Sequence, residues 1–427
     1  MTLLDDARAA LSAGPLCDSC LGRLFADRSF GLTNAERGRS LRVTLALSDD
    51  EPFDPPDECW VCEGEAAPDR IEAWADRAAA ALDRYAFDTY QTGTRVPPLF
   101  EENDRLLREE AGLPADAGEP LKAELNREVG KRIGRQTGAE VDFERPDVLV
   151  VLDLATDELD VQVNSAFVYG RYRKLERGIP QTEWPCTDCN GTGIDRGESC
   201  EGCGGSGYRY DESVEQLTAP VVRDAMDGTE AVFHGAGRED VDARMLGSGR
   251  PFVIEVKEPR DRDVDPADLQ ARINEFADGR VEVEGLHPAT HGMVERVKEL
   301  DAAKTYRMAV AFAEPVTGEA FADALARLDG ATVHQETPER VAHRRADITR
   351  TREVYAADGD LTDDRRATVE IRGEGGLYVK ELVSGDGGRT EPGLAGLLGV
   401  DAEVTALDVL DVEGEDEPFE REAFFRD

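Results

Sequence analysis

The arrangement of the cysteines is the feature that most constrains this 427-residue chain, because all eight lie in Cys-x-x-Cys pairs. Two residues between two thiolates allow both sulfurs to bind one tetrahedral Zn²⁺ ion. Four such pairs therefore predict two Cys₄ sites. No His lies near any pair, so we expect two structural zinc ions and no catalytic metal with an open position. The expected ligands are Cys17, Cys20, Cys59 and Cys62 for the first site, and Cys186, Cys189, Cys200 and Cys203 for the second.

Other interpretations of the cysteines fit the sequence less well. A disulfide framework is unexpected in a large cytosolic chain. A redox role suits one Cys-x-x-Cys pair but not four. The segments "CTDCNGTG" and "CEGCGGSG" form a small internal repeat, whose glycines suit tight turns around a metal. The repeat resembles the zinc-binding repeats of DnaJ-type chaperones, but a zinc-knuckle chaperone would explain nothing after Tyr208.

The net charge of −41 is extreme, and two interpretations compete. One is a partly disordered acidic protein, but 40% of the residues are hydrophobic and their pattern is regular. The other is a folded protein from a salt-rich cytosol, where ions screen the self-repulsion of a carboxylate surface. Because only 7 of the 50 basic residues are lysines, we favour halophilic adaptation. The charge then indicates where the protein works and not what it binds.

Length and hydropathy predict a soluble chain of two or three domains. No apolar run approaches the ~20 residues that cross a bilayer. The stretch "MTLLDDARAALSAGPL" at the N-terminus lacks the basic and apolar regions of a signal peptide. We therefore expect a cytoplasmic protein that does not bind membranes.

Periodic patterns predict an α/β first half and a mixed second half. Residues 69–90 and 119–138 are typical of helices, and 147–154 and 160–175 of strands, whereas residues 1–65 show little periodic structure. Two helices followed by two strands suggest an RNA-binding module. Farther along, helices and strands do not alternate one for one, so we expect a mixed, largely antiparallel sheet. The expected helices there are 208–226 and 266–279, and the expected strands 250–259, 281–290 and 304–315.

Two segments are basic in this otherwise acidic chain. They are "NREVGKRIGRQTG" and "YGRYRKLERG". One interpretation is that salt bridges to neighbouring acids neutralise the positive charges of these segments. The alternative is that Arg171, Arg173 and Lys174 face the phosphates of RNA, while Tyr169 and Tyr172 stack on bases or ribose. We favour the second, since basic islands kept against an acidic background suit a polyanionic ligand.

The stretch "AGREDVDARMLGSGRPF", residues 236–252, has few apolar residues and packs acids and arginines between glycines. It is either a surface turn or a site where arginines hold one carboxylate toward a ligand. The sequence contains no phosphate-binding loop, Rossmann fingerprint, Gly-x-Ser-x-Gly elbow or His-Glu-x-x-His motif, and only five His. The remaining candidates for chemistry are Asp240 in this stretch, Tyr306 in "KTYR" and Tyr378 in "LYVKE".

These motifs carry a resemblance to a known family. "GRED" followed by "VDARMLG" resembles the Gly-Arg-x-Asp motif of pseudouridine synthases, and "KTYR" and "GLYVKELV" resemble two further motifs of that superfamily. With "FVYGRYRKLERGIPQTEWPC", "QETPERVAHRRADITRTREVY" and "GDGGRTEPGLAGLLG", the chain is similar to the archaeal tRNA pseudouridine-54/55 synthases of the Pus-ten type. The resemblance runs from the first Cys pair to about Val400.

The resemblance implies an α+β fold in which a zinc-bearing, THUMP-type α/β RNA-binding region precedes a pseudouridine synthase domain with a mixed, largely antiparallel sheet. We place the zinc-binding N-terminal segment at 1–68 and the THUMP-type domain at 69–183. The second Cys₄ segment follows at 184–210, and the catalytic domain at 211–427.

The resemblance also implies an activity: isomerisation of uridine to pseudouridine at positions 54 and 55 in the T-loop of tRNA. The isomerisation moves no electrons between molecules, which agrees with our expectation of no organic cofactor. The reaction needs an ionised carboxylate beside the base, which a nearby cation favours, and a base turned out of its stack. The expected partner is tRNA, with no obligatory protein partner and a monomeric chain.

By the same resemblance, Asp240 is the reacting carboxylate, as carbon nucleophile or as base, and Arg238 holds its turn. Tyr306 is expected to stack on the target uracil. Tyr378 and Lys380 line the pocket, with Lys380 as the counter-ion of Asp240.

Two alternatives remain open at this point. Asp242 is the alternative reacting acid, with Asp240 as a turn former. For the whole chain, the alternative is a zinc-stabilised tRNA-binding protein without catalytic activity.

Overall fold

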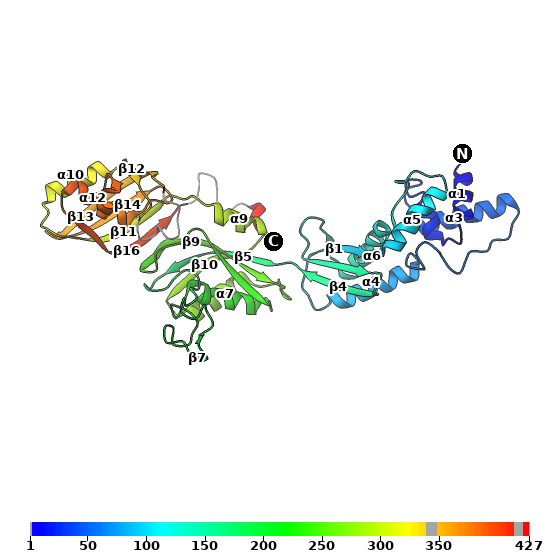
Figure 1. The fold of residues 1–427 in the computed structure, drawn as a ribbon, viewed down its shortest axis with the longest axis horizontal. Helices are drawn as coiled ribbons and strands as arrows, with labels where there is room; N and C mark the ends of the chain where they lie inside the picture. Colours follow the sequence, from blue (N-terminus) through cyan, green and yellow to red (C-terminus); the bar gives the residue numbers. More distant parts are fainter. Residues whose placement is uncertain (1, 339–347, 414–421, 427) are drawn as a thin grey trace. The chain divides into compact units, whose positions relative to one another are not determined.

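A computed structural model describes residues 2–338, 348–413 and 422–426. The chain forms two compact units (Figure 1). The first takes the residues up to Ser165 together with Glu258–Arg262, and the second takes Ala166–Lys257 and the residues from Asp263 onward. Within the described ranges, no helix combines the length and apolar character needed to cross a membrane.

The first unit begins with three helices, α1 (Leu3–Ser12), α2 (Asp18–Arg23) and α3 (Asn34–Asp49), although the sequence suggested little periodic structure here. The helices form because their N-termini are capped and because two glycines allow α2 and α3 to cross at backbone contact. A Cβ atom on Gly22 would lie 1.8 Å from the carbonyl oxygen of Asn34, and one on Gly38 would lie 1.8 Å from that of Asp18. Such packing depends on backbone proximity and leaves a weak amphipathic signal in α3.

The rest of the first unit is an α/β layer, as expected, but the helix expected over 69–90 ends at Leu82, and a strand begins at Thr89. Helices α4 (Pro68–Leu82) and α6 (Leu121–Thr137) contact each other and bury Trp74 and Ile133 with the sheet. Helix α5 (Pro98–Glu110) adds to the same core. The sheet has the order β2-β1-β3-β4, parallel at β1–β2 and β1–β3 and antiparallel at β3–β4. Its strands are β1 (Thr89–Arg95), β2 (Glu140–Val141), β3 (Val148–Asp153) and β4 (Glu158–Val163).

The second unit is built on one large sheet with the order β10-β5-β9-β16-β11-β14-β13-β12-β15, and β8 also pairs with β9. Among the described strands, each pairing in this sheet is antiparallel except that of β9 with β16. The expected mixed, largely antiparallel sheet is confirmed. Its strands are β5 (Ala166–Lys174), β8 (Glu230–Gly235), β9 (Ala243–Lys257), β10 (Val281–Ala289), β11 (Lys304–Phe312), β12 (Thr332–Gln335), β13 (Arg350–Asp363), β14 (Arg366–Gly373), β15 (Thr390–Glu391) and β16 (Ala402–Val412).

Helices pack against both faces of the large sheet around β9. Phe252 and Ile254 of β9 pack in the core that includes α7 and α8, whereas Val253 joins a separate core with Met293 and Val294 of α9. Strand β9 is therefore buried on both faces over Phe252–Ile254, whereas Gly247 and Ser248, nearer its start, are exposed. The helices of this unit are α7 (Val214–Ala225), α8 (Pro266–Ala277), α9 (His291–Glu299), α10 (Gly318–Leu328), α11 (Val379–Ser384) and α12 (Leu394–Leu398).

The stretch expected to be one strand, 160–175, is two strands in different units. Strand β4 ends at Val163, and β5 begins at Ala166 and pairs with β9 and β10 of the second unit. Residues 166–183, which we placed with the THUMP-type domain, thus belong to the unit that carries the large sheet. The division of the first unit into segments 1–68 and 69–165 stays a prediction. The second Cys₄ segment holds a short hairpin of β6 (Ile194–Asp195) and β7 (Glu198–Ser199) within the second unit.

Candidate functional site

The loop between β8 and β9, residues 236–242, carries Asp240 three residues before β9 begins at Ala243. Asp240 is half-buried, with its side chain 36% exposed, whereas the side chain of Asp242 is 70% exposed. The Nζ atom of Lys380 lies 3.0 Å from Oδ2 of Asp240 and 2.9 Å from Oδ2 of Asp242. The structure therefore brings the expected counter-ion to both candidate acids.

Lys380 reaches this loop from the first turn of α11. Burial by itself would lower the pKa of Lys380, but its hydrogen bonds to Asp242 and the charge of Asp240 outweigh that effect, so the pKa is raised. The ammonium group stays charged beside the two carboxylates. A cation in this position favours the ionised form of a neighbouring carboxyl group.

Tyr378 is the N-cap residue of α11 and is half-buried. Its backbone N–H donates to Oε1 of Gln335 at 2.9 Å, and its carbonyl oxygen accepts from Nε2 of Gln335 at 3.0 Å. Gln335 is fully buried at the end of β12. The two bonds fix the backbone from which Lys380 projects. The sequence reasoning missed Gln335, since a lone Gln at a strand end gives no signal of a long-range contact.

Tyr306 lies in the middle of the sheet, on β11 between Ile371 of β14 and Val409 of β16. It is 8% exposed, and burial raises its pKa to about 12 although the nearby Arg250 opposes the shift. The phenol is therefore neutral at physiological pH. Two residues earlier, burial and the charge of Arg250 lower the pKa of Lys304 to about 8.

Beneath the 236–242 loop lies a buried charged cluster that the sequence reasoning did not identify. The Glu239 carboxylate has no exposed surface and lies 3.0 Å from Nε of Arg250 and 3.8 Å from Nζ of Lys174. It also accepts a hydrogen bond from the hydroxyl of Tyr172 at 2.8 Å. Glu239 stands beside Asp240 in the "GRED" motif, so the motif contains two acids that point to different surroundings.

Arg238 was expected to hold the turn, but its side chain is exposed. The turn is held instead by Arg250, whose Nη1 donates to the carbonyl oxygen of Ala236 at 2.7 Å. A signal for Arg250 was present: a charged residue directly before the apolar strand "PFVIEV" lies at a position that the sheet buries.

The residues expected to contact RNA are mostly engaged within the protein. Lys174 has no exposed side-chain surface, and Tyr169 and Tyr172 are 1% and 0% exposed. The expectation that these three contact RNA directly disagrees with the structure, because all three side chains are buried. Tyr172 packs in the large core with α7 and α8, whereas Tyr169 packs in the separate core with Met293 of α9. Arg173 lies 3.0 Å from Glu282, and Arg171 donates to the carbonyl oxygen of Ser248 at 2.7 Å.

The other basic segment, "NREVGKRIGRQTG", lies in α6, and the interpretation that its charges are paired in salt bridges is also the better one. Arg132 pairs with Glu128 at 2.9 Å and with Glu72 at 2.7 Å, and Arg127 pairs with Glu119 at 2.8 Å. Helix α6 therefore carries its basic residues mostly in ion pairs. Only the half-buried Arg171 and Arg173 remain candidates for RNA contacts among the three residues that we named for that role.

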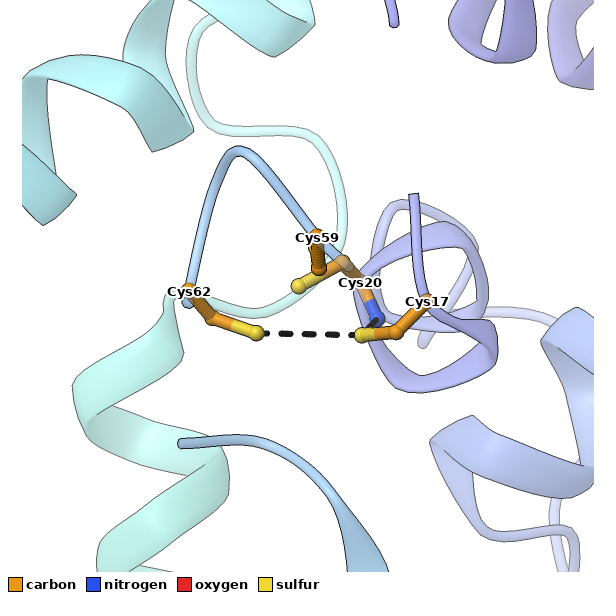
Figure 2. Close-up of side chains that lie close together, drawn as sticks. All are labelled: Cys17, Cys20, Cys59 and Cys62. Atoms are coloured by element: carbon orange, nitrogen blue, oxygen red, sulfur yellow. Dashed lines mark hydrogen bonds between the residues drawn. The ribbon is translucent and has the colours of Figure 1, made fainter. Parts of the chain in front are cut away.

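The eight cysteines form the two expected groups of four, and each group brings its sulfurs within 4.8 Å of one another. Figure 2 shows the first group, in which Sγ of Cys17 lies 3.7 Å from Sγ of Cys62. In the second, Sγ of Cys189 lies 3.8 Å from Sγ of Cys203. A tetrahedral ion with metal–sulfur bonds of about 2.3 Å separates its sulfurs by about 3.8 Å, so both groups fit a metal ion.

Hydrogen bonds also orient the sulfurs. The backbone N–H of Cys20 donates to Sγ of Cys17 at 3.3 Å, and that of Gly207 donates to Sγ of Cys203 at 3.2 Å. In the first group, the buried Arg23 donates from Nη1 to Sγ of Cys20 at 3.0 Å. Donors aimed at thiolate sulfur stabilise its negative charge, and four sulfurs leave no open position for a substrate.

Comparison with known proteins assigns both units. The family model described as "Pus10, C-terminal" matches residues 167–413, and the "Pus10 THUMP domain, archaeal" matches residues 74–153. Among solved structures, the chain is similar to a Cbf5-Nop10-Gar1 complex with 16% identity and a TM-score of 0.31, over 48% of this chain and 46% of that one. A pseudouridylate synthase matches with 14% identity and a TM-score of 0.21, over 60% of this chain and 70% of that one.

Curated relatives match along the whole sequence. A protein of Halorubrum lacusprofundi named "tRNA pseudouridine synthase Pus10" is 66% identical over 100% of both chains. Proteins of the same name from Methanothrix thermoacetophila and Pyrococcus furiosus are 44% and 36% identical, over 96% of this chain and 95% and 98% of theirs. With family models on both units and full-length relatives at this identity, the chain belongs to the Pus10 family.

Proposed function

We propose that this chain converts uridine to pseudouridine in the T-loop of tRNA, at positions 54 and 55, with the Asp240 carboxylate as the reacting group. The observation that carries the proposal is the ion pair of Lys380 with Asp240 in the loop directly before β9. The name shared by the full-length relatives, tRNA pseudouridine synthase, supports the reaction and the substrate.

The reaction is an isomerisation whose atoms balance without a co-reactant. The N1–C1′ bond of the uridine breaks, the uracil turns over, and C5 forms the new bond to C1′. The proton on C5 is lost, and N1 gains one. No electrons enter or leave, so the reaction requires no redox cofactor. It requires a charged carboxylate, a side chain on which the uracil can stack, and a group that transfers the C5 proton.

Each of these demands has a candidate residue in the second unit. Lys380 keeps negative charge favourable at Asp240. Tyr306 supplies a planar ring on which the uracil stacks, because aromatic side chains commonly stack on bases that are flipped out of a helix. Because its phenol is neutral, Tyr306 cannot accept the C5 proton unless its own proton leaves, so it relays a proton rather than acting as a phenolate base.

Asp240 is the better candidate for the reacting acid than Asp242, which is the more exposed of the two. A half-buried carboxylate is screened less by water and ions than an exposed one. Asp242 then shares the charge of Lys380 at the rim of the site. By the family resemblance, Tyr378, whose backbone Gln335 holds, is the residue expected to line the pocket together with Lys380.

Zinc is the metal that best suits the two Cys₄ groups, because four thiolates and no other ligand are typical of structural zinc. The ions would hold irregular segments of each unit and take no part in the isomerisation. We further propose a cytoplasmic, monomeric protein whose partner is tRNA and whose acidic surface suits a salt-rich cytosol, as the similarity to a Halorubrum protein supports.

The test is incubation of the purified chain with an unmodified tRNA transcript in molar KCl, followed by position-resolved mapping of pseudouridine. We expect modification at positions 54 and 55 and at no other uridine. The Asp240→Asn variant is the control for contaminating activity. Tight tRNA binding without any pseudouridine would instead support the alternative of a zinc-stabilised binding protein without catalytic activity.

A further inference from the structure

Three buried side chains hold the backbone of the 236–242 loop from beneath. Arg250 donates to the carbonyl oxygen of Ala236 at 2.7 Å, and Gln181 donates to that of Gly237 at 2.9 Å. Lys174 donates to the carbonyl oxygens of Asp240 at 3.2 Å and Val241 at 3.3 Å. The loop lies beyond the end of β8, so these bonds replace part of the strand pairing that would otherwise fix its backbone.

All three donors meet at the Glu239 carboxylate, directly or through one hydroxyl group. Arg250 and Lys174 lie within ion-pair distance of it, at 3.0 Å and 3.8 Å. Gln181 donates to the hydroxyl of Tyr172 at 2.9 Å, and that hydroxyl donates to Glu239. Glu239 is thus the common partner of the three groups that hold the loop.

The charges require such a partner. The side chains of Lys174 and Arg250 are 0% and 1% exposed. Burial lowers the pKa of Lys174, and the charge of Glu239 acts in the opposite direction. Two buried cations with no nearby anion would be strongly destabilising.

Glu239 and Asp240 are neighbours in the loop but have different surroundings. The side chain of Glu239 has no exposed surface, while that of Asp240 is 36% exposed and reaches Lys380. We propose that Glu239 is the positioning residue of the site: it holds Lys174, which fixes the backbone of Asp240, and Arg250, which fixes the start of the loop at Ala236. This inference rests on the proposed function, in which Asp240 is the reacting carboxylate.

The test compares the Glu239→Gln variant with the wild type in molar KCl, at matched folded fraction, by single-turnover pseudouridine formation and tRNA binding. The amide keeps the shape and removes the charge. Because a displacement of about 1 Å at a reacting group can cost about 100-fold in rate, we expect kcat to fall by about 100-fold. The Kd for tRNA and the metal content should stay within about 2-fold of the wild type, since the Glu239 side chain has no exposed surface with which to contact tRNA.

The chain offers a matched control in its other unit. Asp104 is a buried acid that pairs with the buried Arg23 and Arg108, as Glu239 pairs with Arg250 and Lys174. Asp104→Asn should destabilise its unit but leave kcat of the folded fraction unchanged. An equal loss of kcat in both variants would mean that the loss of any buried ion pair lowers kcat to the same extent, and the proposal would be overturned.

A milder variant keeps the proposal testable where Glu239→Gln fails to fold. Tyr172→Phe retains the ring that packs against Phe233 and Phe252 and removes the hydroxyl that joins Gln181 to Glu239. We expect a smaller loss of kcat, again without a change in Kd. A folded Tyr172→Phe or Glu239→Gln protein with wild-type kcat overturns this inference. Activity in Asp240→Asn overturns the proposed function instead, so the two failures are distinguishable.

Discussion

The ammonium group of Lys380 lies 3.0 Å from the carboxylate of Asp240, at the meeting point of α11 and the loop before β9. Lysine is scarce in this chain, with 7 lysines against 43 arginines. Three of the seven, Lys174, Lys304 and Lys380, nevertheless contact or adjoin the residues around Asp240. Their retention there is consistent with a site that needs compact ammonium groups rather than planar guanidinium groups.

The pair of acids next to Lys380 gives the first prediction. Asp240→Asn should abolish pseudouridine formation and leave tRNA binding nearly intact, because the amide keeps the shape and removes the reacting charge. Asp242→Asn should reduce the rate by no more than about 10-fold, since Lys380 keeps its contact with Asp240. Both variants are compared by single-turnover mapping and by a binding assay. A large loss in Asp242→Asn together with substantial turnover in Asp240→Asn would move the reacting group to Asp242.

The depressed pKa of Lys304 gives a prediction about stability. The pKa is about 8 in the folded protein, against an ordinary value of 10.5. Between these values the unfolded chain binds one more proton than the folded chain, so the free energy of unfolding should rise with pH over this range. Below about pH 8 both states are protonated, and the folded state carries the full cost of the buried charge.

Lys304→Met removes that titration while it keeps the length of the side chain. We expect the free energy of unfolding of the wild type to rise more steeply than that of the variant between about pH 8 and about pH 10. Urea titrations in molar KCl, followed by circular dichroism, measure the difference at each pH. Parallel pH profiles for the two proteins would show that Lys304 is not held at a lowered pKa.

The Cys₄ groups predict two zinc ions per chain. Elemental analysis of the pure protein should find two, and Cys17→Ser or Cys186→Ser should each remove one. Cys17→Ser should lower the unfolding temperature of the first unit without lowering kcat of the folded protein, because the proposed active site lies in the second unit. One ion or none in the wild type would mean that a Cys₄ assignment is wrong.

The net charge of −41 predicts an unusual dependence on salt. Protein–RNA affinity ordinarily falls with salt, since phosphate contacts release counterions. Here the acidic surface should repel tRNA at low salt and cease to do so as the Debye length falls from ~30 Å at 0.01 M to ~3 Å at 1 M. We therefore expect binding and activity to rise with KCl into the molar range.

A KCl titration of tRNA affinity tests this expectation, with folding followed separately by circular dichroism. Replacement of exposed acids on α10 and β13, such as Asp323→Lys and Asp360→Lys, should recover part of the binding at low salt. Tightest binding of the folded wild type at low salt would show that the acidic surface does not govern the encounter with RNA.

The sequence by itself determined the features that are local or that a motif carries. Each Cys-x-x-Cys pair places two sulfurs together because only two residues separate them, so the two Cys₄ groups followed from spacing. The helices over 121–137, 214–225 and 266–277 followed from apolar periodicity. The "GRED", "KTYR" and "GLYVKELV" motifs led to the family, and hence to Asp240, Tyr306 and Lys380 as candidates.

Only the tertiary structure decided which polar residues are buried and what they hold. The segment "YGRYRK" is basic in sequence, yet its alternation along β5 sends Tyr172 and Lys174 into the core beneath the 236–242 loop. Their burial depends on the pairing of β5 with β9, strands that are far apart in the chain. In the same way, Glu239 and Asp240 are both acids in one short motif, and the buried charges of Lys174 and Arg250 assign the first to the interior. Pairing between distant strands and compensation of buried charge are set by the whole fold, so no local pattern could reveal them.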